Sequence, residues 1–325
     1  MFKASKNRTY ATALLVMVLA AAGQARGVAA EAELRAAGDA QQAGSASPLR
    51  LEVGPAAEPG VKAGQLRQSG PIVVTEDGAV IENLEIVGPG REGDPASHTG
   101  TGIEVRGAEN VTIRNVRVRG FRVALAATDA ESLTVEDSDF SDNWTDPNYG
   151  WGDGERVGGL IFTGVEGATL RRVKAQRNWN GLDLLDTERV TAEDCDFSHC
   201  TNVGLKLERA SNNRFVRNDI SYGIRISPGE VHARDSTGVL LESGSDMNYF
   251  EANDFRFGGN GLFIRVLNGW PSVGNVFYRN DASGANNNGF ESWSPGNVYI
   301  ENIANESSYG FWLGGSDHTM LIGNV

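Results

Sequence analysis

The chain has 325 residues with 41 glycines, 10 prolines and 40% hydrophobic residues, a composition that excludes disordered and collagen-like proteins. Its formal net charge of −13 argues against nucleic acid as a partner, because phosphate binding needs a basic surface. The same charge leaves neutral sugars and cations open as ligands.

Residues 1–30 have the pattern of a secretory signal peptide. Lys3, Lys6 and Arg8 precede a short apolar stretch over residues 11–22, and small residues that permit cleavage follow it. That stretch is too short to span a bilayer, so we expect a secreted or periplasmic protein with no membrane insertion. Residues 31–68 are rich in Ala, Glu, Gly and Gln, and we expect a linker or a poorly ordered lead-in there.

From residue 69 onward one pattern recurs, a glycine followed by apolar residues that alternate with variable ones. Its copies begin at Gly102, Val123 (without the glycine), Gly159, Gly181, Gly204, Gly238, Gly261, Gly289 (a weaker copy) and Gly310. From Gly159 onward the starts are 22, 23, 34, 23, 28 and 21 residues apart. This spacing indicates a unit of about 22 residues into which longer loops are inserted.

Most later units also carry an asparagine three residues after an apolar residue. The pairs are Phe215/Asn218, Phe250/Asn253, Phe277/Asn280, Tyr299/Asn302 and Leu321/Asn324, and in earlier units the asparagine position holds Val116, Ser138, Val173 and Cys195. A residue at one fixed phase of a coil stacks on its copies above and below. We therefore expect these asparagines to point inward and to bond to one another along a column, since buried polar groups persist when they are paired.

Each unit reads as three short strands with two tight corners and one looser loop, because apolar residues alternate with period two and no segment has a helical period. Stacked units make a parallel solenoid. The pattern resembles the right-handed parallel β-helix proteins, the superfamily of pectate lyases and polygalacturonases. The resemblance implies an all-β, right-handed parallel β-helix over residues 69–325, with about ten rungs. The last rung stops just after Asn324, so we expect the domain to continue past the end of this chain.

Cys195 and Cys200 are the two cysteines of the chain. Five residues of extended chain separate them by roughly 17 Å, too far for a disulfide. We predict that both are free and structural.

Residues between the inward apolar positions of the opening strands form outward columns, and charge gathers in the middle rungs. Rungs lie about 4.8 Å apart, so we expect Asp183 to face Lys206 and Glu208 to face Glu242, with Arg265 one rung further on. Like charges stacked in this way repel, and a site that tolerates them favours a bound cation, a shared proton or a catalytic use. Because Lys206 points outward, we expect its substitution to leave the fold intact.

Two long insertions lead into opening strands beside these charges. Residues 141–158 and 222–237 are expected to form two walls of a groove with a charged floor. The candidate residues that they contribute are Trp144, Tyr149 and Trp151 from the first insertion, and Arg225, His232 and Arg234 from the second.

The first function that fits is a polysaccharide lyase or related uronate-acting enzyme. Lyases of the resembled superfamily commonly use Lys or Arg as the base and carboxylates to hold Ca²⁺. The resemblance implies Lys206 or His232 as the base, with Arg225, Arg234 and Arg265 on the substrate carboxylate. It implies Asp183, Glu208 and Glu242 as Ca²⁺ ligands.

The second is a glycoside hydrolase with paired carboxylates. The spacing of Glu208 and Glu242 suits a retaining mechanism, and the wider pair of Asp183 and Glu242 suits inversion. Aromatic rings of the first insertion would stack on sugar faces. The paired aspartates typical of polygalacturonases are not present.

The third is a non-catalytic glycan-binding protein or a periplasmic accessory β-helix protein. The four histidines lie in separate rungs and lack the spacing of a metal site, which weakens a metal-linked version of this function. In all three hypotheses the partner is a polysaccharide or oligosaccharide, and no organic cofactor is expected.

Overall fold

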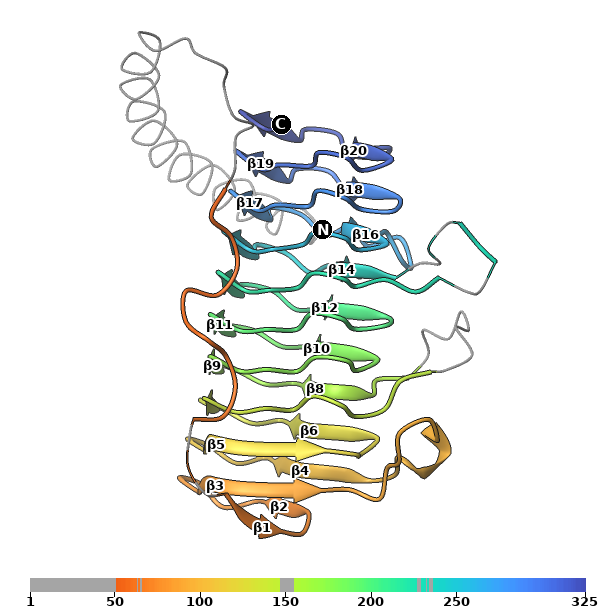
Figure 1. Ribbon diagram of the computed structural model, residues 1–325. Coiled ribbons are helices and arrows are strands. Elements are labelled where there is room, and N and C mark those ends of the chain that lie inside the picture. Colours follow the sequence, from red (N-terminus) through yellow and green to blue (C-terminus); the bar gives the residue numbers. More distant parts are fainter. Residues whose placement is uncertain are drawn as a thin grey trace, which may run out of the picture. The chain divides into compact units, whose positions relative to one another are not determined.

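The computed structural model describes residues 51–62, 64, 66–146, 155–226, 229–231, 233 and 236–325. Residues Leu51–Val325 form one compact unit. Its strands stack as two parallel sheets, visible in Figure 1 as columns of short arrows along the coil. The described residues include the short 3-10 helix η1 (Pro95–Ser97) and contain no helix long and apolar enough to cross a membrane.

Sheet 1 has 11 strands and sheet 2 has 10, and consecutive strands of the chain alternate between the two sheets. The strands of sheet 1 are β1 (Arg67–Ser69), β3 (Val80–Val87), β5 (Thr112–Arg119), β7 (Thr134–Glu136), β9 (Thr169–Arg171), β11 (Thr191–Glu193), β13 (Arg214–Val216), β15 (Tyr249–Glu251), β17 (Val276–Tyr278), β19 (Val298–Ile300) and β21 (Met320–Ile322). The strands of sheet 2 are β2 (Ile72–Val74), β4 (Thr101–Arg106), β6 (Val123–Thr128), β8 (Gly158–Thr163), β10 (Asn180–Leu185), β12 (Val203–Glu208), β14 (Thr237–Glu242), β16 (Asn260–Ile264), β18 (Asn288–Ser292) and β20 (Tyr309–Trp312).

Equivalent residues of successive repeats pair in register. In sheet 2, Leu182 pairs with Leu205, and Leu205 with Val239. All three are fully buried, so the alternating apolar residues fill the inside of the coil as predicted. The all-β, parallel solenoid architecture is therefore confirmed.

The predicted third strand of each unit is reduced to isolated bridges, such as those that join Asp196 to Asp219 and Asp219 to Asp254. The reason is the length of the segment. Arg217 and Tyr222 both have left-handed backbone conformations, with φ of 52° and 55°. The extended chain between these two corners is too short for a regular ladder.

The predicted asparagine column is confirmed. The Nδ2 groups of Asn218, Asn253, Asn280 and Asn302 each donate to the Oδ1 of the next asparagine at 2.9–3.0 Å, and Asn324 ends the series. The first four of these side chains are fully buried. Each also donates to a main-chain carbonyl of the preceding rung, so the buried amides are satisfied.

A second ladder of asparagines, which the sequence analysis missed, lies at the other end of each sheet 1 strand. It joins Asn213, Asn248, Asn275 and Asn297 through Nδ2–Oδ1 hydrogen bonds of 3.0 Å. Each member precedes one of the predicted column by five residues. The second ladder is therefore as regular in the sequence as the first.

Between the two ladders, four aromatic rings stack inside the coil. The centroids of Phe215, Phe250, Phe277 and Tyr299 are 4.9–5.0 Å apart along the series. In an earlier rung Cys195 takes the asparagine position, and its amide donates to Asn218 Oδ1 at 2.9 Å. Both cysteines are free and buried, as predicted.

Residues 51–62, which were predicted as part of a linker, lie along the outside of the coil as an N-terminal strap (Figure 1). The amide of Gly54 donates to Ala252 O at 3.0 Å, and that of Gly60 to Arg172 O at 2.8 Å. Further along, Lys62 Nζ pairs with Asp137 at 2.5 Å. The strap thus spans several rungs, and this part of the lead-in is ordered. Residues 31–50 and the predicted signal peptide lie outside the described residues.

Candidate functional site

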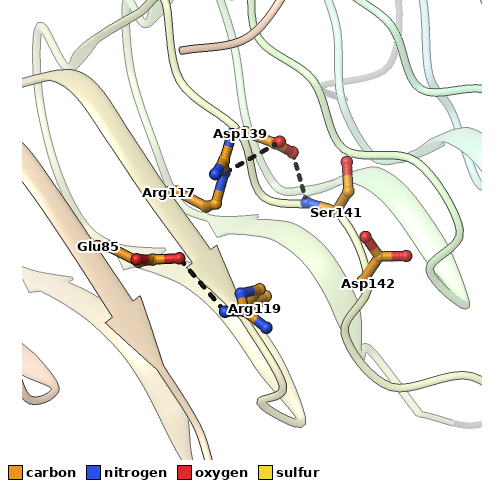
Figure 2. A pocket seen from close by; sticks show the side chains of 6 residues that line it. All are labelled: Glu85, Arg117, Arg119, Asp139, Ser141 and Asp142. Carbon is orange, nitrogen blue, oxygen red and sulfur yellow. Dashed lines mark hydrogen bonds and ion pairs between the residues drawn. The ribbon is translucent and has the colours of Figure 1, made fainter. Parts of the chain in front are cut away.

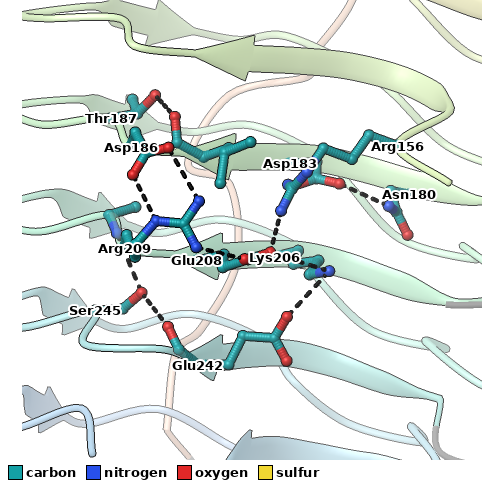
Figure 3. A network of polar contacts seen from close by, with 12 residues as sticks. Arg156, Asn180, Asp183, Asp186, Thr187, Lys206, Glu208, Arg209, Glu242 and Ser245 are labelled. Atoms are coloured by element: carbon teal, nitrogen blue, oxygen red, sulfur yellow. Dashed lines mark hydrogen bonds and ion pairs between the residues drawn. The ribbon is translucent and has the colours of Figure 1, made fainter. Parts of the chain in front are cut away.

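The outer face of sheet 2 brings the predicted charged residues together (Figure 3). The register pairs Asp183 with Lys206 and Glu208 with Glu242, as the sequence analysis expected. Arg265 follows β16 and reaches back to the Glu242 carboxylate, with Nε donating to Oε2 at 2.5 Å. We call these five side chains, together with Arg156, the ion cluster.

Three members of the cluster are buried, although they lie on the outer face of sheet 2. Asp183 is 0% exposed, Glu242 1% and Lys206 7%. The acidic and basic side chains pack against one another, and Arg156 enters from the end of the first insertion to cover them. The sequence analysis expected replacement of Lys206 to leave the fold intact. Because Lys206 is buried among charged groups, we now expect its removal to lower stability by stranding buried charge.

The stacked pair of glutamates is separated by a cation. Lys206 Nζ lies 3.1 Å from Glu242 Oε1 and 3.8 Å from Glu208 Oε2. The ammonium group thus lies within ion-pair distance of both carboxylates. The ammonium group of Lys206 therefore offsets the repulsion for which the sequence analysis expected a bound cation, a shared proton or a catalytic use.

Arg156, which the sequence analysis missed, bridges two carboxylates of the cluster. Its guanidinium group binds both Asp183 and Glu208. On the other side of Glu208, Arg209 Nη1 donates to Oε1 at 2.8 Å while its Nε donates to Asp186 at 2.6 Å. Arg156 is the last charged residue before the Gly159 strand. Its position next to that strand is the sequence signal that could have identified it.

Asp183 is a fully buried carboxyl group with two cationic neighbours. Burial raises its pKa, while the neighbouring charges of Arg156 and Lys206 act in the opposite direction. Asn180 Nδ2 also donates to Oδ2 at 2.9 Å.

Arg225 is buried beneath the site and does not line it. Its side chain is 2% exposed, and its guanidinium carbon lies 4.8 Å from the centre of the Trp179 ring. Nη1 donates to Asn202 at 3.5 Å, Asn202 donates to Asn180 at 2.8 Å, and Asn180 holds Asp183. Arg225 thus supports the cluster from behind, where it was predicted to bind substrate directly.

Trp144 lies beside a cavity of about 350 Å³ at the entry to β4 and β6. Its ring packs edge-on against Trp179 at 5.6 Å between centroids, and the Arg122 guanidinium lies 5.0 Å from its centre. His98 also lines this cavity, which we call the Trp144 pocket. Tyr149, Trp151, His232 and Arg234 lie outside the described residues, and their roles stay predictions.

The described arrangement does not fit a resident Ca²⁺ ion on Asp183, Glu208 and Glu242. Each of these carboxylates is engaged by an arginine or lysine of the chain, so cationic side chains already occupy the space beside them that a metal ion would take. Across the described ranges, no group of three His, Cys, Asp or Glu side chains is placed to hold a metal. A Ca²⁺ requirement stays a prediction of the sequence alone, and no step below depends on it.

A second cavity, of about 250 Å³, opens on the side of sheet 1 (Figure 2). It is lined by Glu85, Arg117, Arg119, Asp139, Ser141 and Asp142. Arg119 pairs with Glu85 at 3.3 Å and Arg117 with Asp139 at 3.6 Å. These are half-exposed surface ion pairs of small energetic weight, and we assign the cavity no role.

Solved structures with similar coils include the A-module of the Azotobacter vinelandii mannuronan C-5 epimerase AlgE6, at 11% identity and a TM-score of 0.43 over 79% of this chain and 88% of that chain. A periplasmic alginate epimerase, AlgG, is similar at 13% identity and a TM-score of 0.44, over 76% of this chain and 61% of that one. The catalytic domain of a GH87 α-1,3-glucanase has 11% identity and a TM-score of 0.45, over 76% and 55%. The chain thus spans less than two thirds of the last two proteins, and these likenesses carry no argument about activity.

No sequence among curated proteins matches the chain at a significant level. A family model described as the right-handed β-helix region matches residues 101–265 and 158–325. The two matches together cover more than half of the chain and contain the ion cluster and both asparagine ladders. The chain therefore belongs to the right-handed β-helix family.

Proposed function

We propose that this chain is an exported carbohydrate-active protein, a polysaccharide lyase or related uronate-acting enzyme, which binds an acidic glycan across the ion cluster. The observation that carries the proposal is the burial of Asp183, Lys206 and Glu242 on the outer face of the coil. Equivalent positions of the two preceding rungs hold Ile161 and Ala126, so the fold does not need charge there. Burying charge is costly, and perturbed ionisable groups gather at functional sites.

The cations of the cluster suit a substrate that carries a carboxylate. Glu208 is the most exposed of the three cluster carboxylates, with 21% of its side chain accessible, and it is bound by Arg156 and Arg209. A uronate carboxylate has the same charge and shape as this group. It can replace Glu208 on Arg156 without leaving the guanidinium group uncompensated.

Proton abstraction next to the uronate carboxylate then needs a base, and Lys206 is the described residue that we propose for it. To act as a base, Lys206 must first lose a proton. The carboxylates of Glu242 and Glu208, 3.1 and 3.8 Å away, are the groups placed to accept it. Lys206 takes the proton from the carbon beside the carboxylate, and a carbanion forms there. The carbanion either expels the glycosidic oxygen from the neighbouring carbon, with a C=C bond formed and the leaving oxygen protonated by the Lys206 ammonium or by water, or takes a proton back at the same carbon.

A second candidate function is glycoside hydrolysis, which the raised pKa of Asp183 favours. A carboxyl group with a raised pKa holds its proton more firmly than an exposed one, which suits a general acid that donates to a leaving glycosidic oxygen. Arg156 would have to move away from Asp183 when substrate binds. Glu208 would then be the described carboxylate left to act as nucleophile or base.

The test is incubation of the protein with alginate, polygalacturonate and soluble neutral glucans, with and without a chelator. A lyase produces unsaturated uronate ends that absorb in the ultraviolet. A hydrolase produces reducing ends without that absorbance. Exchange of the ring proton beside the carboxylate in D₂O, without chain cleavage, would indicate abstraction followed by reprotonation. If the protein neither binds nor alters any of these glycans, the proposal is wrong.

A further inference from the structure

The outer face of sheet 2 changes character beyond the ion cluster. Over β18 and β20 it carries large aromatic side chains: Trp293 is 42% exposed, and Tyr309 and Trp312 belong to the following strand, β20. The rings of Tyr309 and Trp312 lie 5.0 Å apart between centroids in an edge-on arrangement. Single exposed apolar residues are common on protein surfaces, but a contiguous group of aromatic rings marks a binding surface.

Trp293 is held in a fixed orientation. Its Nε1 donates to Glu291 Oε1 at 2.8 Å, and the other oxygen of Glu291 accepts from Asn288 Nδ2 at 2.7 Å. The ring also lies over Gly314, where a Cβ atom would come within 2.8 Å of the indole. A ring immobilised before binding loses little conformational entropy when a ligand stacks on it.

These aromatic residues continue directly from the ion cluster. Phe263 pairs with Glu291 and Glu291 with Trp312 in the sheet register. Trp293 follows β18 at the position that Arg265 occupies after β16, and its amide donates to Ile264 O at 2.9 Å. Arg265 in turn binds Glu242. One rung, about 4.8 Å, therefore separates the cluster from the first exposed indole.

We propose that Trp293, Trp312 and Tyr309 form a stacking platform for sugar rings of the same glycan that the ion cluster binds. The inference rests on the proposed function and adds a substrate class, an extended chain of several sugar units that lies along the coil axis. Sugar rings present C–H faces that pack on indole and phenol rings, and hydroxyl groups that bond to their polar edges. A chain that leaves the cluster past Arg265 reaches Trp293 first, which is why a glycan fits this surface better than an unrelated protein.

The experiment uses isothermal titration calorimetry at low temperature, where turnover is slow. It measures the affinity of the protein for alginate, polygalacturonate and a soluble glucan, and for the matching disaccharides. The Trp293→Ala and Trp312→Ala variants are compared with the parent and with Tyr278→Ala, an aromatic residue of sheet 1. For the glycan that the parent binds, each tryptophan variant should reduce the ratio of polymer to disaccharide affinity roughly fivefold or more. Tyr278→Ala should leave this ratio unchanged, and Trp293→Phe, which keeps a ring, should restore most of it.

An Arg156→Met variant separates the platform from the proposed function. If this variant weakens polymer and disaccharide binding alike while the tryptophan variants leave the affinity ratio unchanged, the cluster binds glycan and the platform is refuted. If Arg156→Met has no effect while the tryptophan variants weaken polymer binding, the platform stands and the proposed role of the cluster fails. A parent that binds no glycan of the set refutes both.

Discussion

Replacing Asn253 by leucine tests the asparagine ladder at its centre. The Asn253 side chain donates to Phe215 O at 3.0 Å and to Asn280 Oδ1 at 2.9 Å. Its Oδ1 accepts from the amide of Asn218 at 2.9 Å and from Asn218 Nδ2 at 3.0 Å. Leucine has the same branched outline, with two larger methyl groups, and can form none of these four hydrogen bonds.

The loss of stability depends on which hydrogen-bond partners of Asn253 are left without any other partner. Asn280 Oδ1 keeps a hydrogen bond from the Asn253 amide, and Asn218 Nδ2 keeps one to Ala192 O. The amide of Asn218 loses its acceptor, and a buried group left unsatisfied costs about 1–3 kcal/mol. With the net loss of the other bonds, we expect the free energy of unfolding to fall by about 2–4 kcal/mol.

Urea denaturation followed by tryptophan fluorescence measures this change. Asn324→Leu is the matched control, because Asn324 makes the same kind of contacts but is only partly buried, so water can replace them. We expect the control to lose about 1 kcal/mol. Equal midpoints for Asn253→Leu and the parent would refute the ladder as a source of stability.

Three further outcomes follow from the described contacts. Lys206→Ala should lower the free energy of unfolding by about 3 kcal/mol, since it leaves the buried Glu242 with Arg265 alone, and an unchanged urea midpoint would contradict the buried pair. Burial raises the pKa of Asp219, so its ionisation destabilises the fold as pH rises above about 4. Asp219→Asn should therefore raise the melting temperature at pH 7 and lose this advantage below about pH 4, where both forms are neutral; a gain that persists in acid would rule out the electrostatic cause. Burial alone would raise the pKa of Asp137, but hydrogen bonds from Arg172 and Lys62 outweigh it and lower this pKa. The stability that this carboxylate contributes is therefore present above about pH 4, and it is lost as the pH falls through the lower pKa of the folded state. Lys62→Ala should raise that pKa in an NMR titration of the carboxyl carbon, and no shift would show that the strap does not hold Asp137.

The coil and the asparagine column that includes Asn253 could be predicted because their sequence pattern recurs in many repeats along the chain. Every copy of the repeat places Phe250, Asn253 and their equivalents at the same phase, so an error in one copy is corrected by the others. The sheet register that pairs Asp183 with Lys206 followed from the same repetition. The second ladder, at Asn248 and its equivalents, carried an equally regular signal.

The environment of the site could not be read in this way, because it depends on segments that occur once. Arg156 closes the ion cluster from a non-repeating insertion, and nothing in its spacing distinguishes it from other arginines of the loops. Burial of Lys206 follows from that closure. The strap over residues 51–62 has neither apolar periodicity nor a repeat, and its order comes from contacts with residues far away in the sequence, such as Asp137.

The most direct test of the central claim is the position of a bound uronate oligosaccharide in a crystal of the complex. Our account predicts a carboxylate of the sugar chain on Arg156 or Arg265, with the chain lying along the outer face of sheet 2 and a sugar ring stacked on Trp293. A glycan bound on sheet 1, or contacts to the outer face of sheet 2 that leave the ion cluster untouched, would contradict it.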